Sequence, residues 1–245
     1  MFTHHNLKVY DKALTLAGCA EELSAPWGRR HAVVEQFRRA SESIVLNIAE
    51  GARLPAAPDK AKTLDYAIGS SLECAACLDV ASIKGFLNRE TTLAEKRSYA
   101  EVTRMLVGLR KAWLVKVMRE EPDPYQPESA DPDPEPLFHH ESLDVYKTAL
   151  EFMAWFVGLP GAMELSDRLC RQVDKSATSL VLNVAEGNGR YSELDHRRFL
   201  EMAAQSAVKA AAYLDLYQRK AIPIQVETAD GKQLLSRIIA MLNGF

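Results

Sequence analysis

Few residues in this chain have the types and spacing that catalysis or metal binding requires. Glu193 and His196 form a Glu-x-x-His, a spacing with which four-helix bundles hold a pair of iron ions. Such a centre needs a second Glu-x-x-His and two further glutamates, whereas the related positions in the other half of the chain are Ala57 and Lys60. We therefore expect neither a metal ion nor a cofactor.

Cys74 and Cys77 form a Cys-x-x-Cys, a spacing that is also found in redox-active sites. A reactive pair normally stands at a helix N-terminus, where the thiolate is stabilised, but this pair lies inside an apolar helical pattern. We expect both thiols to be core side chains. The sequence has no recognisable catalytic triad, phosphate-binding glycine loop or pair of catalytic acids, so we predict a protein that is not an enzyme.

Small and amide side chains recur at helical spacing along one segment, and the pattern returns in the second half of the chain. This polar stripe consists of Gln36, Ser43, Asn47 and Glu50, and then of Gln172, Ser179, Asn183 and Glu186. The spacing places each set on one face of a helix. Two interpretations are open: Ser43 and Asn47 satisfy each other or Ser70 inside a bundle, or the stripe is a seam to another bundle or to nucleic acid.

Each stripe ends in a glutamate followed by a glycine. Gly51 and Gly187 are typical of helix C-caps in left-handed geometry. A glutamate at a helix C-terminus is disfavoured by the helix dipole, so we expect Glu50 and Glu186 each to have a specific partner, such as an arginine.

Basic residues gather in short groups near the starts of the predicted helices. These candidates for nucleic-acid binding are Arg29, Arg30, Arg38, Arg39, Lys60, Lys62, Arg190, Arg197 and Arg198. They are either solvated helix faces or contacts to phosphates, and phosphate contacts would make binding strongly dependent on salt. Aromatic residues are not interleaved with them, which argues against sequence-specific recognition of single strands.

The chain contains the same sequence unit twice, as a tandem repeat. Residues 1–109 align with residues 137–245 without a gap, and about 30 of the 109 paired positions are identical. The run SIVLNIAEG in the first copy returns as SLVLNVAEG in the second. We interpret this as a tandem duplication.

Apolar residues recur at helical spacing in four segments of each copy, and Gly, Pro and polar stretches separate the segments. No segment alternates with the period of a strand. The sequence therefore predicts an all-α fold, with two tandem up-down-up-down four-helix bundles. We place the first bundle at residues 1–119, a linker rich in Pro and acidic residues at 120–136, and the second bundle at 137–245.

The net charge of −3 is unevenly distributed. Residues 122–136 carry five acidic residues and no basic ones, so the remainder of the chain is slightly basic. No secretion signal or uninterrupted apolar span stands out, which predicts a cytoplasmic protein without a membrane partner.

Both copies resemble the four-helix-bundle family of 23S rRNA intervening-sequence proteins, which includes the accessory variability determinant of diversity-generating retroelements. The resemblance is carried by Leu7, Val9 and Tyr10, by Gln36, Arg39 and Ala40, by the run 43–51, and by Gly69 and Ser70. The second copy departs from the family pattern at Lys175, Ser176 and Gln205. The resemblance implies a small non-enzymatic bundle that commonly forms pentameric rings and, in retroelements, binds a reverse transcriptase and its RNA.

The sequence and the resemblance together lead us to expect a non-catalytic adaptor for a protein or ribonucleoprotein partner, such as a reverse transcriptase and its RNA. The alternative is a purely structural, self-assembling protein that binds no nucleic acid. Because five is odd, chains with two bundles cannot fill a five-membered ring evenly. We therefore expect the bundles to pair within one chain, with a homo-oligomer as the other possibility.

Overall fold

The computed structural model describes residues 3–114, 136–165, 167–219 and 228–244. Within these ranges the regular structure is entirely helical, which confirms the predicted fold class. The first copy forms α1 (Lys8–Ser24), α2 (Ala32–Arg53), α3 (Ala57–Ile83) and α4 (Arg89–Leu114). The second forms α5 (Asp144–Val157), α6 (Arg168–Asn188), α7 (Glu193–Arg219) and α8 (Ala229–Leu242). The linker predicted at 120–136 lies outside the described residues, apart from Pro136.

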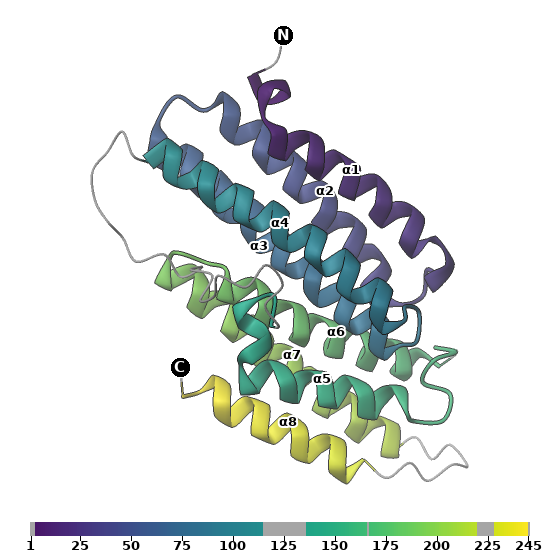
Figure 1. Cartoon of the computed structure of the whole chain (residues 1–245). Helices are drawn as coiled ribbons and strands as arrows, with labels where there is room; N and C mark the ends of the chain where they lie inside the picture. Colours follow the sequence, from purple (N-terminus) through teal and green to yellow (C-terminus); the bar gives the residue numbers. More distant parts are fainter. Residues whose placement is uncertain (1–2, 115–135, 166, 220–227, 245) are drawn as a thin grey trace.

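Short 3₁₀ turns at Thr3–Asn6, Ala25–Trp27 and His139–Ser142 lead into or out of these helices. The two bundles lie side by side with α3 and α6 facing each other, while α1 and α8 lie on opposite outer sides (Figure 1). The boundary between the copies therefore runs along two long helices.

Helix α3 is buried over most of its length. It is apolar around most of its circumference, which is typical of a helix that is covered on all sides. It is also the one described helix long and apolar enough to cross a membrane, but 78% of its most apolar window is buried inside the protein. Helices α2 and α4 cover it from its own bundle, and α5 and α6 cover it from the other.

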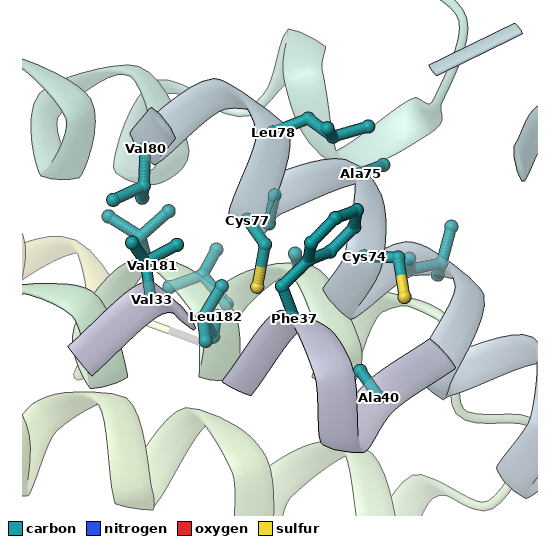
Figure 2. Close-up of a cluster of buried hydrophobic side chains, with 14 of the residues drawn as sticks. Val33, Phe37, Ala40, Cys74, Ala75, Cys77, Leu78, Val80, Val181 and Leu182 are labelled. Carbon is teal, nitrogen blue, oxygen red and sulfur yellow. The ribbon is translucent and has the colours of Figure 1, made fainter. Parts of the chain in front are cut away.

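The core continues from one bundle into the other. Phe37 of α2 and Cys77 of α3 lie beside Val181 and Leu182 of α6 (Figure 2). Both thiols of the Cys-x-x-Cys are buried among apolar side chains, and this burial raises their pKa well above the ordinary value. They are core residues, as the sequence predicts.

The pairing of the two bundles is not two-fold symmetric. Helix α3 packs on α6 and α5, whereas a two-fold axis would also require its counterpart α7 to pack on α2, and no comparable packing joins those helices in the described ranges. The interface is heterologous: each bundle contributes a different face.

The prediction that Gly51 and Gly187 are left-handed C-caps is wrong. Both residues lie inside their helices, and neither has a positive φ. A Cβ on Gly51 would lie 2.3 Å from Thr63 Oγ1, and one on Gly187 would lie 2.8 Å from Phe199 Cβ. The glycines instead allow the second and third helix of each bundle to approach closely.

Candidate functional site

The centre of each polar stripe is satisfied inside its own bundle. Ser43 Oγ lies 2.8 Å from Ser70 Oγ, and the Asn47 amide donates to the Ser43 carbonyl oxygen at 2.8 Å. In the second copy Ser179 Oγ lies 3.0 Å from Ser206 Oγ, and Asn183 donates to the Ser179 carbonyl at 2.7 Å. The serine pairs connect the second and third helices of each bundle, and the asparagine bonds lie within the second helix.

The ends of the stripes differ between the copies. Gln36 accepts a hydrogen bond from Arg39 at 2.6 Å, and Glu50 is exposed on α2. Glu186 instead forms an ion pair with Arg190 at the boundary between the bundles. The partner predicted for each glutamate is thus present for Glu186, an arginine, whereas Glu50 has none among the described residues.

Arg190 is held at one end of the interface by both bundles. Its side chain is 5% exposed, and its guanidinium donates to the backbone carbonyl of Asp65 in α3 at 3.3 Å. It also lies 5.1 Å from the ring centroid of Tyr66 and 4.6 Å from that of Phe199. This residue joins the bundles and is not on an open surface.

Glycines at this end allow close approach between α3 and the end of α6. A Cβ on Gly69 would lie 2.9 Å from Arg190 Cζ, and a Cβ on Gly189 would lie 2.3 Å from Leu72 Cδ1. Gln205 takes the place of Gly69 in the second copy and is exposed. At this position, glycine is therefore required only in the first copy, where the other bundle packs against it.

Glu73 of α3 and Glu186 of α6 lie close enough at the interface for their charges to interact. Burial and the neighbouring carboxylate of Glu186 raise the pKa of Glu73 to about 8, against the opposing effect of Arg39 and Arg190. Burial also raises the pKa of Glu186, although Arg190 and Arg39 oppose this rise. The interface thus prefers Glu73 in its protonated form.

The opposite end of the interface contains a fully buried ion pair. Lys84, at the end of α3, pairs with Asp174 of α6, and both side chains are only 1% exposed. The second carboxylate oxygen of Asp174 accepts a hydrogen bond at 3.0 Å from the backbone N–H of Ala32, the first residue of α2. His31 lies beside Lys84, and burial, followed by the charge of Lys84, lowers its pKa.

Asp174 therefore caps a helix of the other bundle. In the second copy, α6 is capped by its own Asp167, which accepts from Leu169 N at 2.7 Å. The corresponding residue of the first copy is His31, whose side chain makes no cap hydrogen bond. The missing cap is supplied across the interface.

A third polar cluster lies where α5 and the 3₁₀ turn before it meet α3 and α4. Lys96 forms ion pairs with Asp79 at 2.7 Å and with Glu141 at 2.8 Å. Tyr146 of α5 donates to the other oxygen of Asp79 at 2.8 Å. Burial, followed by the charge of the nearby Lys96, lowers the pKa of His140 well below its ordinary value, which favours the neutral imidazole.

The other basic candidates form two groups at opposite ends of the bundle pair, with a third on α2. Arg29 and Arg30 are exposed just before α2, at the end marked by Lys84. Lys60 and Lys62 lie in the first two turns of α3, and Arg197 and Arg198 lie in the first two turns of α7, at the end marked by Arg190. On α2, Arg38 is paired with Glu21 at 2.8 Å, and Arg39 lies 3.9 Å from Glu73.

The described ranges contain no group of three or more His, Cys, Asp or Glu residues arranged to hold a metal ion. His196, the histidine of the Glu-x-x-His, lies with Nδ1 2.8 Å from the Gly187 carbonyl oxygen. It therefore helps to join α6 to α7.

Most residues of the interface have no distinguishing local pattern in the sequence. Asp65, Glu73, Lys84 and Asp174 were not distinguished from ordinary helix-surface residues. The available signal was a difference between the copies: Glu73 corresponds to Lys209, Asp174 to Arg38, and Arg190 to Leu54. Such changes mark places where one copy has a partner that the other lacks.

A comparison with protein-family models matches this chain twice, at residues 5–108 and 141–244, to the family described as 23S rRNA-intervening sequence protein. No curated protein and no solved structure matches the chain. The two matched segments confirm the resemblance and the tandem arrangement that the sequence predicts.

The buried ion pair generates a stability prediction. We expect Asp174→Ala to lower the free energy of unfolding by about 3–5 kcal/mol, because it leaves the Lys84 ammonium buried without a partner. The matched control Asp167→Ala removes only a local helix cap and should cost about 1 kcal/mol. Urea unfolding of the full chain measures both, and equal costs would contradict the role assigned to Asp174.

The buried glutamate pair generates a pH prediction. The folded state raises the pKa of Glu73 from 4.5 to about 8, so its contribution to stability is full below pH 4.5 and is lost as the pH rises through 8. Glu73→Gln should therefore become progressively more stable relative to the unmodified chain across this range. Chemical unfolding at several pH values measures the difference, with Glu42→Gln on the exposed side of α2 as the control. If the difference in stability between Glu73→Gln and the unmodified chain did not change with pH, the raised pKa of Glu73 would be refuted.

Proposed function

Because the chain belongs to the family of 23S rRNA-intervening sequence proteins, with two tandem copies of the family domain, we propose that it is a non-catalytic adaptor for a ribonucleoprotein. In this role the paired bundles form a rigid platform, and exposed side chains contact the partner. A reverse transcriptase and its RNA are the partner that the resemblance favours.

The observation that carries this proposal is that both copies contribute exposed basic residues to the same end of the molecule. Arg190 contacts Tyr66 in α3 and Phe199 in α7, so the starts of these helices lie near each other. Lys62 stands one turn before Tyr66, and Arg197 and Arg198 directly precede Phe199; all three are exposed. Cations on two adjoining helices suit the phosphate backbone of a folded RNA.

The RNA part of the proposal predicts salt-sensitive binding. A structured RNA should bind the full chain at low salt and should dissociate as the salt concentration rises, because each phosphate contact releases counterions. Arg197→Glu/Arg198→Glu should weaken binding and reduce the slope of log affinity against log salt by about 1–2. Fluorescence anisotropy titrations at several salt concentrations measure both quantities.

A matched control is available at the opposite end of the molecule. Arg29→Glu/Arg30→Glu changes the net charge by the same amount and should leave most of the binding intact. An equal loss in both variants would contradict the proposed location. An absence of binding at low salt, or binding that does not depend on salt, would contradict the RNA role itself.

The protein part of the proposal has its own test. A gene for a reverse transcriptase beside the gene for this chain, together with a variable repeat, would support the retroelement role. Co-purification of that enzyme with the unmodified chain, and its persistence after ribonuclease treatment, would show a direct protein contact. Complete loss of the enzyme after ribonuclease treatment would mean that this chain contacts the RNA and does not contact the enzyme directly.

A further inference from the structure

Tyr66 of α3 is the one Phe, Trp or Tyr side chain in the described ranges that is exposed, at 37%; the others are buried or half-buried. Its counterpart in the second copy is Met202. Arg190, whose side chain is only 5% exposed, lies with its guanidinium 5.1 Å from the centroid of the tyrosine ring. A buried guanidinium therefore supports this ring from the interior, and the rest of the ring is open to solvent.

A second tyrosine belongs to the same cluster. Tyr191 directly follows Arg190 and is half-buried, and the guanidinium of Arg110 lies 3.7 Å from its ring centroid. Arg110 also donates to Asp65 Oδ1 at 2.5 Å, and Asp65 directly precedes Tyr66 in α3. We call Tyr66 and Tyr191 the tyrosine cluster. Its two rings come from different bundles, and each is held by an arginine.

Exposed cations stand beside the tyrosine cluster. Lys62 precedes Tyr66 by four residues, which places both side chains on the same face of α3. Arg197 and Arg198 are exposed near the start of α7, and the residue that follows them packs on the same buried guanidinium as Tyr66. The fold thus places aromatic rings next to cations that are distant in the sequence, where the two types of residue do not alternate.

We propose that Tyr66 stacks on an unpaired base of the bound RNA while the cations beside it contact the neighbouring phosphates. This inference rests on the proposed function and names the part of the RNA that the site takes, namely a base in a loop or a bulge. A base inside a paired helix is already stacked on both sides, so the ring of a side chain cannot cover it. Stacking is tolerant of sequence, because every base has a π-face.

The charges at this end show why a stacking contact matters. The exposed carboxylates of Asp59 and Glu193 lie at the starts of α3 and α7, near the exposed cations. They weaken the electrostatic attraction that this end exerts on phosphates. A stacked base adds a contact that does not depend on charge. Because Arg190 already supports the ring of Tyr66, little conformational freedom is lost when a base binds.

The first test compares two RNAs that carry the same number of phosphates. One is a hairpin with a single-stranded loop, and the other is a fully paired duplex. Fluorescence anisotropy at one low salt concentration measures the affinity of the full chain for each. We expect the hairpin to bind about tenfold more tightly, since one stacked base contributes a factor of this order. Equal affinities for the two RNAs would overturn the proposal.

Two substitutions at one position isolate the ring. Tyr66→Ala removes it and should weaken hairpin binding by about tenfold, with little change in duplex binding and an unchanged slope of log affinity against log salt. Tyr66→Phe keeps the ring and is the matched control, which should bind the hairpin like the unmodified chain. Circular dichroism verifies that both variants are folded. Equal losses of hairpin affinity in the two variants would contradict stacking.

A fluorescent base reports the contact directly. The fluorescence of 2-aminopurine is quenched when the base stacks, so a hairpin with this base in its loop should change in intensity as the unmodified chain or Tyr66→Phe binds. Tyr66→Ala, at concentrations that saturate the hairpin, should produce a much smaller change. A 2-aminopurine signal that is the same for all three proteins at every loop position would overturn the role of Tyr66.

Failure of this inference is distinguishable from failure of the proposed function. If hairpin and duplex bind equally and both dissociate as the salt concentration rises, the RNA role stands and the stacking contact is overturned. If neither RNA binds at low salt, the RNA role and the stacking contact are overturned together.

Discussion

Buried charges at the boundary between the bundles must be paired, and the rest of the structure depends on this constraint. Lys84 is enclosed at the end of α3, and its partner Asp174 comes from the other copy. Arg190 is similarly enclosed and bonded to the backbone of α3. Removing water from an unpaired charge costs several kcal/mol, so these residues fix the register of α3 on α6. Apolar contacts supply the buried area of the interface.

Duplication explains how one sequence pattern can serve different surroundings. The two copies keep the same internal bonds, Ser43 with Ser70 and Ser179 with Ser206, because each bundle needs them. They differ where only one copy meets a neighbour, as at Gly69 and Gln205. The asymmetry of the pair follows from its heterologous geometry, in which the third helix of one bundle covers the first and second helices of the next.

The sequence was sufficient to predict the helices, the two bundles and the family. Apolar periodicity is visible within a single segment, and the repeat is visible when the two halves of the chain are compared. It also predicted an arginine partner for Glu186 from helix electrostatics. It could not identify Asp174 as the cap of α2, because that contact joins residues far apart in the chain. The C-cap interpretation of Gly51 was wrong because tertiary packing against Thr63, and not backbone conformation, requires the glycine.

We expect the buried interface to make the two bundles one cooperative unit. The chain has three tryptophans, Trp27 and Trp113 in the first bundle and Trp155 in the second. Variants that retain only Trp27 or only Trp155 therefore allow each bundle to be followed separately. We predict that their fluorescence unfolding curves in urea coincide in midpoint and free energy. Two separate transitions, with one bundle remaining folded while the other unfolds, would contradict the account.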